Sequence, residues 1–126
     1  MNIHLDAPEQ IVWQNNSGHV TFSKNSFVNI LHEREIWDDE AYRVLEKALL
    51  GVAGKYREKS LPRDLMLAIF DLYDYVFGRL VWHQIPTDGS VIENLTDEEC
   101  HQRWERLNYV VRGALGGYPL KDDILD

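Results

Sequence analysis

Residues 60–84 read SLPRDLMLAIFDLYDYVFGRLVWHQ, and this stretch decides the fold class. Apolar side chains recur in it every three or four residues, which places them along one side of a helix. Pro62 suits the first helical position, where its missing N–H costs no hydrogen bond. The helix is expected to end before Pro86, because a residue that precedes proline avoids the helical conformation. The main apolar stripe consists of Leu65, Ile69, Leu72, Val76 and Leu80.

A second apolar row widens that stripe over much of the helix circumference. It consists of Met66, Phe70, Tyr73, Phe77 and Val81. A helix that is apolar on so many sides is expected at the centre of a bundle, in contact with neighbouring helices on two sides. The row therefore predicts that residues 60–84 form a central helix.

Two further helices are predicted on either side of this one. The first begins at Asp38 or Asp39 and stops near Gly54, with acidic residues in its first turn, where the helix dipole favours them. The second covers residues 96–116 and opens with TDEE, the pattern of a capping box. Their apolar positions are Ala41, Val44, Leu45, Ala48, Leu49 and Val52 in the first, and Cys100, Trp104, Leu107, Val111 and Leu115 in the second.

Residues 1–22 allow two interpretations. Asp6 as a cap and Pro8 in the first turn predict a short helix through Ile11–Trp13. The alternative is a hairpin that pairs Ile11–Trp13 with Val20–Phe22. We favour the helix, and we expect another to begin at a serine, Ser23 or Ser26.

These patterns together predict an all-α fold, a bundle of four to five helices with short connections. The whole chain, 1–126, has the length of one domain. Its single cysteine forms no disulfide within the chain, which fits a reducing compartment such as the cytosol. The apolar runs are too short to span a membrane, and residues 1–6 lack the features of a secretory signal.

The charge balance indicates what kind of partner to expect. The chain has 21 acidic and 13 basic residues, a net charge of −8, which opposes direct binding to nucleic acid and favours a basic partner. The basic residues between Arg43 and Arg63 are interpreted as a solvated helix face followed by a loop, and a regulator that binds nucleic acid through them is the rival hypothesis.

No residue pattern supports catalysis, a cofactor or a metal. His32 and Glu33 lack the second histidine of a zinc-protease motif, because Ile36 stands four positions after His32. Asp97 and His101 share a helix face but are explained by the helix start and by exposure. Cys100 has acidic neighbours, which disfavour a reactive thiolate. We therefore expect a protein that is not an enzyme.

A candidate binding surface lies on the helix over 60–84. Asp71, Asp74, Tyr75, Gly78 and Trp82 form a stripe opposite much of the main apolar face. Carboxylates beside exposed aromatic rings are typical of a surface that binds a basic protein. In the alternative, Tyr75 and Trp82 pack under a neighbouring helix and the aspartates are merely solvated. Further acids that could extend the surface are Asp38 and Asp39, and Asp122, Asp123 and Asp126 in the acidic tail, 118–126.

The chain resembles the small immunity proteins of bacterial contact-dependent growth inhibition (CdiI type). The resemblance rests on the character of the whole chain and on the stretches MNIHLDAPEQIVWQNN, LMLAIFDLYDYVFGRLVWHQIP and PLKDDILD. It implies a cytoplasmic protein that binds a toxin domain one-to-one, in many cases a nuclease that attacks tRNA or DNA. These immunity proteins share no motif, so the resemblance assigns no site residues. The alternative hypothesis is a helical adaptor or regulatory domain that binds another protein.

Overall fold

The computed structural model describes residues 7–85 and 91–118 of the chain. Within them the secondary structure is entirely helical, so the prediction of an all-α bundle is confirmed. The five helices are α1 (Pro8–Gln14), α2 (Phe27–Arg34), α3 (Asp39–Lys55), α4 (Arg63–His83) and α5 (Asp97–Gly116).

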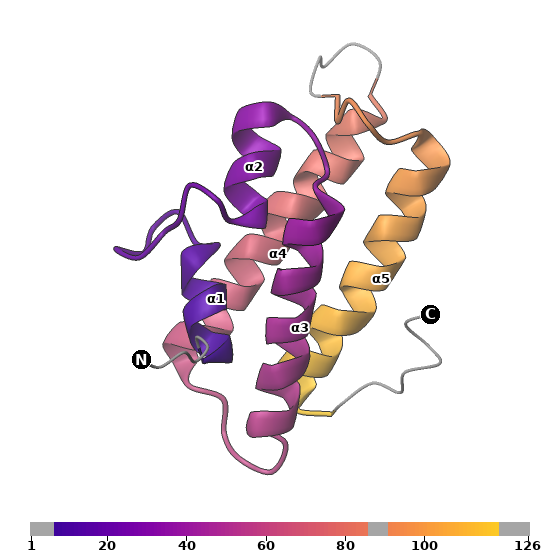
Figure 1. The fold of residues 1–126 in the computed structure, drawn as a ribbon. Coiled ribbons are helices and arrows are strands. Elements are labelled where there is room, and N and C mark those ends of the chain that lie inside the picture. The colour runs from indigo at the N-terminus through magenta and orange to yellow at the C-terminus, as the bar shows by residue number, and fades with distance from the viewer. Residues whose placement is uncertain (1–6, 86–90, 119–126) are drawn as a thin grey trace.

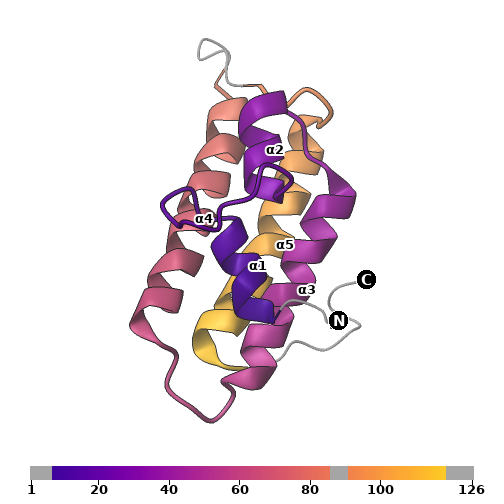
Figure 2. The same cartoon turned by 60° about the vertical axis from the view of Figure 1, so that its left-hand side comes forward.

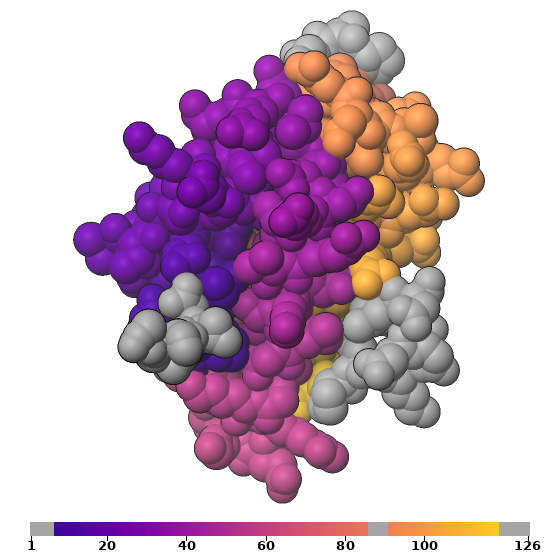
Figure 3. Space-filling model, in the orientation of Figure 1, coloured from indigo at the N-terminus to yellow at the C-terminus, as the bar shows by residue number. Residues whose placement is uncertain are grey.

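The three long helices run along the bundle, with α4 antiparallel to α3 and α5 (Figure 1). Both α3 and α4 pack against α5 and also against the short helix α1. Figure 2 shows α1 in front of the space between α3 and α4, with α2 further along the same side. Figure 3, in the orientation of Figure 1, shows the surface of α3 between the N-terminal segments and α5.

The hairpin alternative over residues 11–22 is wrong. Ile11–Trp13 continue the helix that starts at Pro8, and the polar residues behind them form turns held by their own side chains. Asn15 donates its amide Nδ2 to the Ile11 carbonyl at 2.9 Å and accepts from the Val28 N–H at 3.0 Å. These bonds fix the segment between α1 and α2 without any strand pairing.

The predicted main stripe of α4 forms the centre of the core. All five residues, Leu65, Ile69, Leu72, Val76 and Leu80, are buried. At one end of the core, Phe27 packs edge-on against Trp37 with ring centroids 4.7 Å apart. Burying each large apolar side chain contributes about 1.5–3 kcal/mol, so these contacts dominate the stability of the fold.

Helix α4 contacts neighbouring helices on two sides as predicted, but its second apolar row is largely exposed, which a central helix would not show. Met66, Phe70, Phe77 and Val81 are 43%, 53%, 37% and 40% exposed. The reason is that α1 and α5 cover α4 from the sides, and no described helix covers its outer face. Tyr73 alone of that row is half-buried, against α5. Two predicted core positions on the flanking helices, Val44 and Leu115, are also exposed.

The helix ends follow the predicted capping chemistry with two corrections. The Ser26, Asp38 and Thr96 side chains each accept a backbone N–H in the first turn of α2, α3 and α5 respectively, and Thr96 forms the full capping box. Gly117 ends α5 with φ of 71°, a backbone conformation that glycine adopts without strain. The N-cap of α1 is Ala7, and the predicted cap, Asp6, lies outside the described residues. Pro62 is the N-cap of α4 and not its first helical residue.

Candidate functional site on the outer face of α4

The structure brings together four of the five residues of the predicted α4 stripe on the solvent side of the helix. Asp71 and Asp74 are exposed, and Trp82 is 51% exposed although it is the largest side chain on the helix. Gly78 lies between them, and a Cβ at this position would meet no atom within 4 Å. The alternative in which Trp82 packs under a neighbouring helix is therefore wrong.

Tyr75, in contrast, is half-buried against α2. Its hydroxyl lies 3.2 Å from His32 Nδ1 and receives a hydrogen bond of 3.2 Å from Arg79 Nη1. The Tyr75 hydroxyl therefore contacts one side chain of α2 and one of α4. The packed alternative thus describes Tyr75 correctly, and this side chain holds α4 and α2 together.

Arg79 is a buried cation that the sequence interpretation missed. It is only 8% exposed, and the same Nη1 also donates to the carbonyl of Leu31 at 3.3 Å. Leu31 lies in the last turns of α2, where the helix dipole leaves partial negative charge. That field offsets part of the cost of burying the guanidinium. The only signal in the sequence was one arginine placed near the buried side of an apolar helix.

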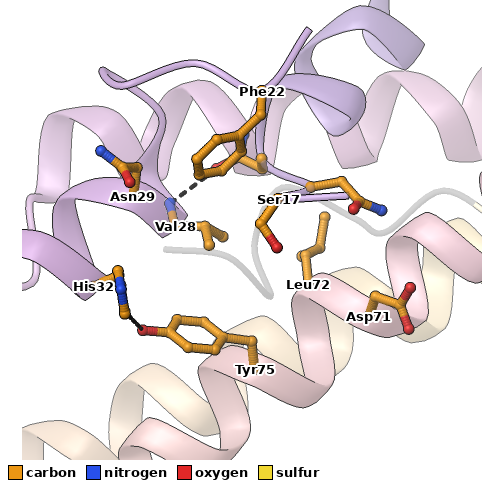
Figure 4. A pocket seen from close by; sticks show the side chains of 10 residues that line it. Ser17, Phe22, Val28, Asn29, His32, Asp71, Leu72 and Tyr75 are labelled. Atoms are coloured by element: carbon orange, nitrogen blue, oxygen red, sulfur yellow. Dashed lines mark hydrogen bonds between the residues drawn. The ribbon is translucent and has the colours of Figure 1, made fainter. Parts of the chain in front are cut away.

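A pocket of about 340 Å³ opens beside this network, between α4, α2 and the turns after α1 (Figure 4). Asp71 and Tyr75 line it from α4, and His32 lines it from α2. Ser17 and Phe22 form the wall contributed by the turns. The sequence identified Asp71 and Tyr75, but it held no sign that residues 15–22 fold back toward them.

A second groove, of about 230 Å³, runs between α4 and α5. Phe77 and Val81 line it from α4, and Trp104 lines it from α5. Trp104 donates its indole N–H to the Tyr73 hydroxyl at 3.1 Å, which fixes the ring. The outer side of α4 is therefore acidic along Asp71 and Asp74, with exposed apolar side chains next to them.

The other predicted surface acids lie elsewhere. Asp38 caps α3, and Asp39 lies 3.7 Å from Arg103 of α5, beside Arg106. Arg106 is two residues from Trp104, which places it on nearly the opposite side of α5 from the α4 groove. The structure therefore does not join Asp39 to the α4 face. Asp122 and Asp123 lie outside the described residues.

The structure gives the burial and the neighbours of the side chains that were considered for catalysis. Cys100 is buried, and burial together with nearby acids raises the pKa of its thiol to about 11. Asp97 lies 3.4 Å from His83, whereas His101 lies 3.7 Å from Glu105, so these two side chains are near different residues. The described residues hold no group of three His, Cys, Asp or Glu that could bind a metal. None of the described helices is long and apolar enough to cross a membrane.

Comparison with known proteins supplies the identity that geometry alone does not. The family model described as Immunity protein 41 matches residues 14–122. The chain belongs to this family. No curated protein and no solved structure matches the chain.

Membership in Immunity protein 41 confirms the prediction of an immunity protein, a class whose members neutralise a toxin. The match does not distinguish the contact-dependent type from other immunity proteins, so that part stays a prediction. The match to Immunity protein 41 assigns no residues that contact the toxin, so the role of the outer face of α4 stays a prediction.

Proposed function

We propose that the chain neutralises a basic toxin domain, such as a nuclease, by binding it one-to-one through the outer face of α4. The observation that carries the proposal is Trp82, a large aromatic side chain left half exposed on the same side of one helix as Asp71 and Asp74. Buried aromatic anchors with polar surroundings contribute most of the binding energy in protein interfaces.

The carboxylates of Asp71 and Asp74 make this face suited to the basic substrate-binding site of a nuclease. A nuclease holds its substrate with basic side chains that contact phosphates. Asp71 and Asp74 stand three residues apart and point to the same side of α4, where they could pair with two such cations. Inhibition of this kind requires occupation of the toxin surface and no chemistry by the inhibitor.

The net charge of −8 adds long-range attraction to the local contacts. Opposite charges accelerate the encounter of two proteins, and dissolved salt screens that attraction over about 8–10 Å. The association rate with the toxin is therefore expected to fall steeply as salt is added, while the dissociation rate depends on the close contacts.

The first experiment captures the partner with the tagged chain from its source lysate and identifies it by mass. The toxin domain so identified is then purified and titrated with the chain by calorimetry. A basic domain bound at one-to-one stoichiometry, whose toxicity the chain suppresses on co-expression, supports the proposal. A partner that is not a toxin, or a toxin that stays active when saturated with the chain, contradicts it.

The choice of face is tested with a charge-matched pair of double variants. The variant Asp71→Lys with Asp74→Lys changes the net charge by the same amount as Glu40→Lys with Glu58→Lys, which lie on other parts of the surface. We expect the α4 variant to lose several kcal/mol of binding if these acids lie at the interface centre, and the control to lose association rate only. Equal losses in the two variants would show that another face binds the toxin.

The exposed apolar row of α4 favours a second candidate function, a helical adaptor. Phe70, Phe77 and Val81 could receive the apolar side of a partner helix, as adaptor domains commonly do. Binding of this kind would depend little on salt. A partner that binds equally well at low and high salt, and is unaffected by the Asp71 and Asp74 variant, would favour the adaptor.

A further inference from the structure

We infer that the pocket between α4, α2 and the turns after α1 receives a single arginine or lysine side chain of the toxin. The inference rests on the proposed function and deepens it, because it assigns a specific contact to Asp71. The pocket lies on the same side of α4 as the proposed binding face and shares Asp71 and Tyr75 with its stripe (Figure 4).

The walls of the pocket suit the stem of a long cationic side chain. Phe22, Val28 and Leu72 contribute apolar surface from three different segments, and Tyr75 adds an aromatic ring. Arginine and lysine bury their methylene stems along such surface and keep the charged end in a polar setting. A guanidinium also stacks favourably on an aromatic ring.

Asp71 provides the charge at one end of the pocket. It is the only carboxylate among the described residues that line the pocket. No hydrogen bond or ion pair engages this carboxylate within the described part of the chain. Ser17 adds a hydroxyl on the wall that faces α4. A carboxylate and a hydroxyl acceptor can together receive several N–H bonds from a guanidinium.

The opposite end of the pocket fixes the direction in which the cation enters. There the Tyr75 hydroxyl is occupied by Arg79 and His32, and the buried Arg79 guanidinium lies behind it. A second cation is repelled from that end and attracted to Asp71. An anionic ligand is disfavoured, because it would face Asp71, whereas Arg79 is buried and does not line the pocket.

The spacing along α4 allows one toxin surface to use the pocket and Trp82 together. Asp71 and Trp82 are eleven residues apart, which corresponds to about 16 Å along a helix. A standard interface covers roughly 800 Å² on each partner, a patch about 30 Å across. The pocket and the indole therefore fit within one interface of ordinary size.

The test compares Asp71→Asn with Asp74→Asn against the purified toxin domain. Both residues are exposed on α4 and both changes remove one negative charge, so effects on folding and on long-range attraction are matched. We expect Asp71→Asn to weaken binding at least tenfold, and several times more than Asp74→Asn, because only Asp71 lines the pocket. Equal losses overturn the pocket inference while leaving toxin binding by α4 intact.

A probe that does not need the toxin separates the two proposals. N-acetyl-arginine methylamide is titrated into the labelled chain and followed by two-dimensional NMR, with N-acetyl-glutamate methylamide as the matched anionic control. We expect the arginine probe to shift the amide signals of Ser17, Val28 and Leu72 with millimolar affinity, and Asp71→Asn to abolish these shifts. The absence of such shifts at about 50 mM probe, or equal shifts from the glutamate probe, overturns the inference whatever the toxin does.

Discussion

Replacing Gly78 tests the proposed face without damaging the fold. Glycine in the interior of a helix costs about 1 kcal/mol relative to alanine, and Gly78 lies inside α4, five residues before its end. A Cβ there meets nothing within 4 Å, so a side chain at this position needs no rearrangement of its neighbours. Both Gly78→Ala and Gly78→Arg are therefore expected to stabilise the chain by about 0.5–1 kcal/mol.

The two variants should differ sharply in toxin binding. Position 78 is one helical turn from Asp74 on one side and from Trp82 on the other, so an arginine placed there lies between them and pairs with Asp74. It also repels a basic partner. We expect Gly78→Arg to weaken toxin binding by a factor of about 10–100, which corresponds to about 1.4–2.8 kcal/mol, and Gly78→Ala by less than threefold.

Two measurements decide the outcome. Urea unfolding followed by circular dichroism gives the stability of each variant, and calorimetric titration with the toxin domain gives its affinity. If Gly78→Arg binds within threefold of Gly78→Ala, the outer face of α4 is not the toxin interface. If both variants are less stable than the parent chain, the space around position 78 is not free as the structure indicates.

Four further predictions concern single residues. Trp82→Ala should weaken toxin binding by about 2 kcal/mol or more and change the free energy of unfolding by less than about 1 kcal/mol, measured by calorimetry and urea unfolding. Arg106→Met should destabilise the fold by about 2–3 kcal/mol in urea unfolding, because it leaves the buried Glu46 carboxylate without its cation. Arg106 contacts this carboxylate at 2.7 and 2.8 Å. A loss of stability below about 0.5 kcal/mol would contradict this prediction. Cys100 should resist a thiol reagent at pH 8 in the folded chain and react once urea unfolds it, because it is buried and its pKa is raised to about 11. Burial favours a higher pKa of Glu9, but hydrogen bonds from Lys55 and Tyr56 outweigh it and lower the pKa. The free energy of folding that ionised Glu9 contributes is therefore present above about pH 4.5 and is lost as the pH falls. The stability lost on acidification should be smaller in Glu9→Gln.

The sequence predicted those features of the fold that depend on neighbouring residues. Thr96 and Glu99 form a capping box because both partners lie within one turn. The stripe from Leu65 to Leu80 is buried because its spacing defines one side of a helix whatever packs there.

The features that depend on distant segments could not be predicted. Periodicity gives the side of a helix on which Phe70 and Phe77 lie, but it does not say whether another helix covers that side. Arg79 and Glu46 are buried because Leu31 and Arg106, which lie far away in the chain, provide their partners. The pocket wall at Ser17 and Phe22 likewise requires the turns after α1 to fold back onto α4.

Several residues on the outer side of α4 make the isolated chain less stable than simple substitutions would. A glycine at position 78 makes α4 less stable than an alanine would, and the half-exposed Trp82 and Phe70 leave apolar surface in contact with water. Single substitutions such as Gly78→Ala, or a polar residue at position 70, would stabilise the isolated chain. A folded chain generally agrees with local rules except where binding requires otherwise. These residues lie on the outer side of α4, where the carboxylates and the pocket also lie, so a single bound partner would account for all of them.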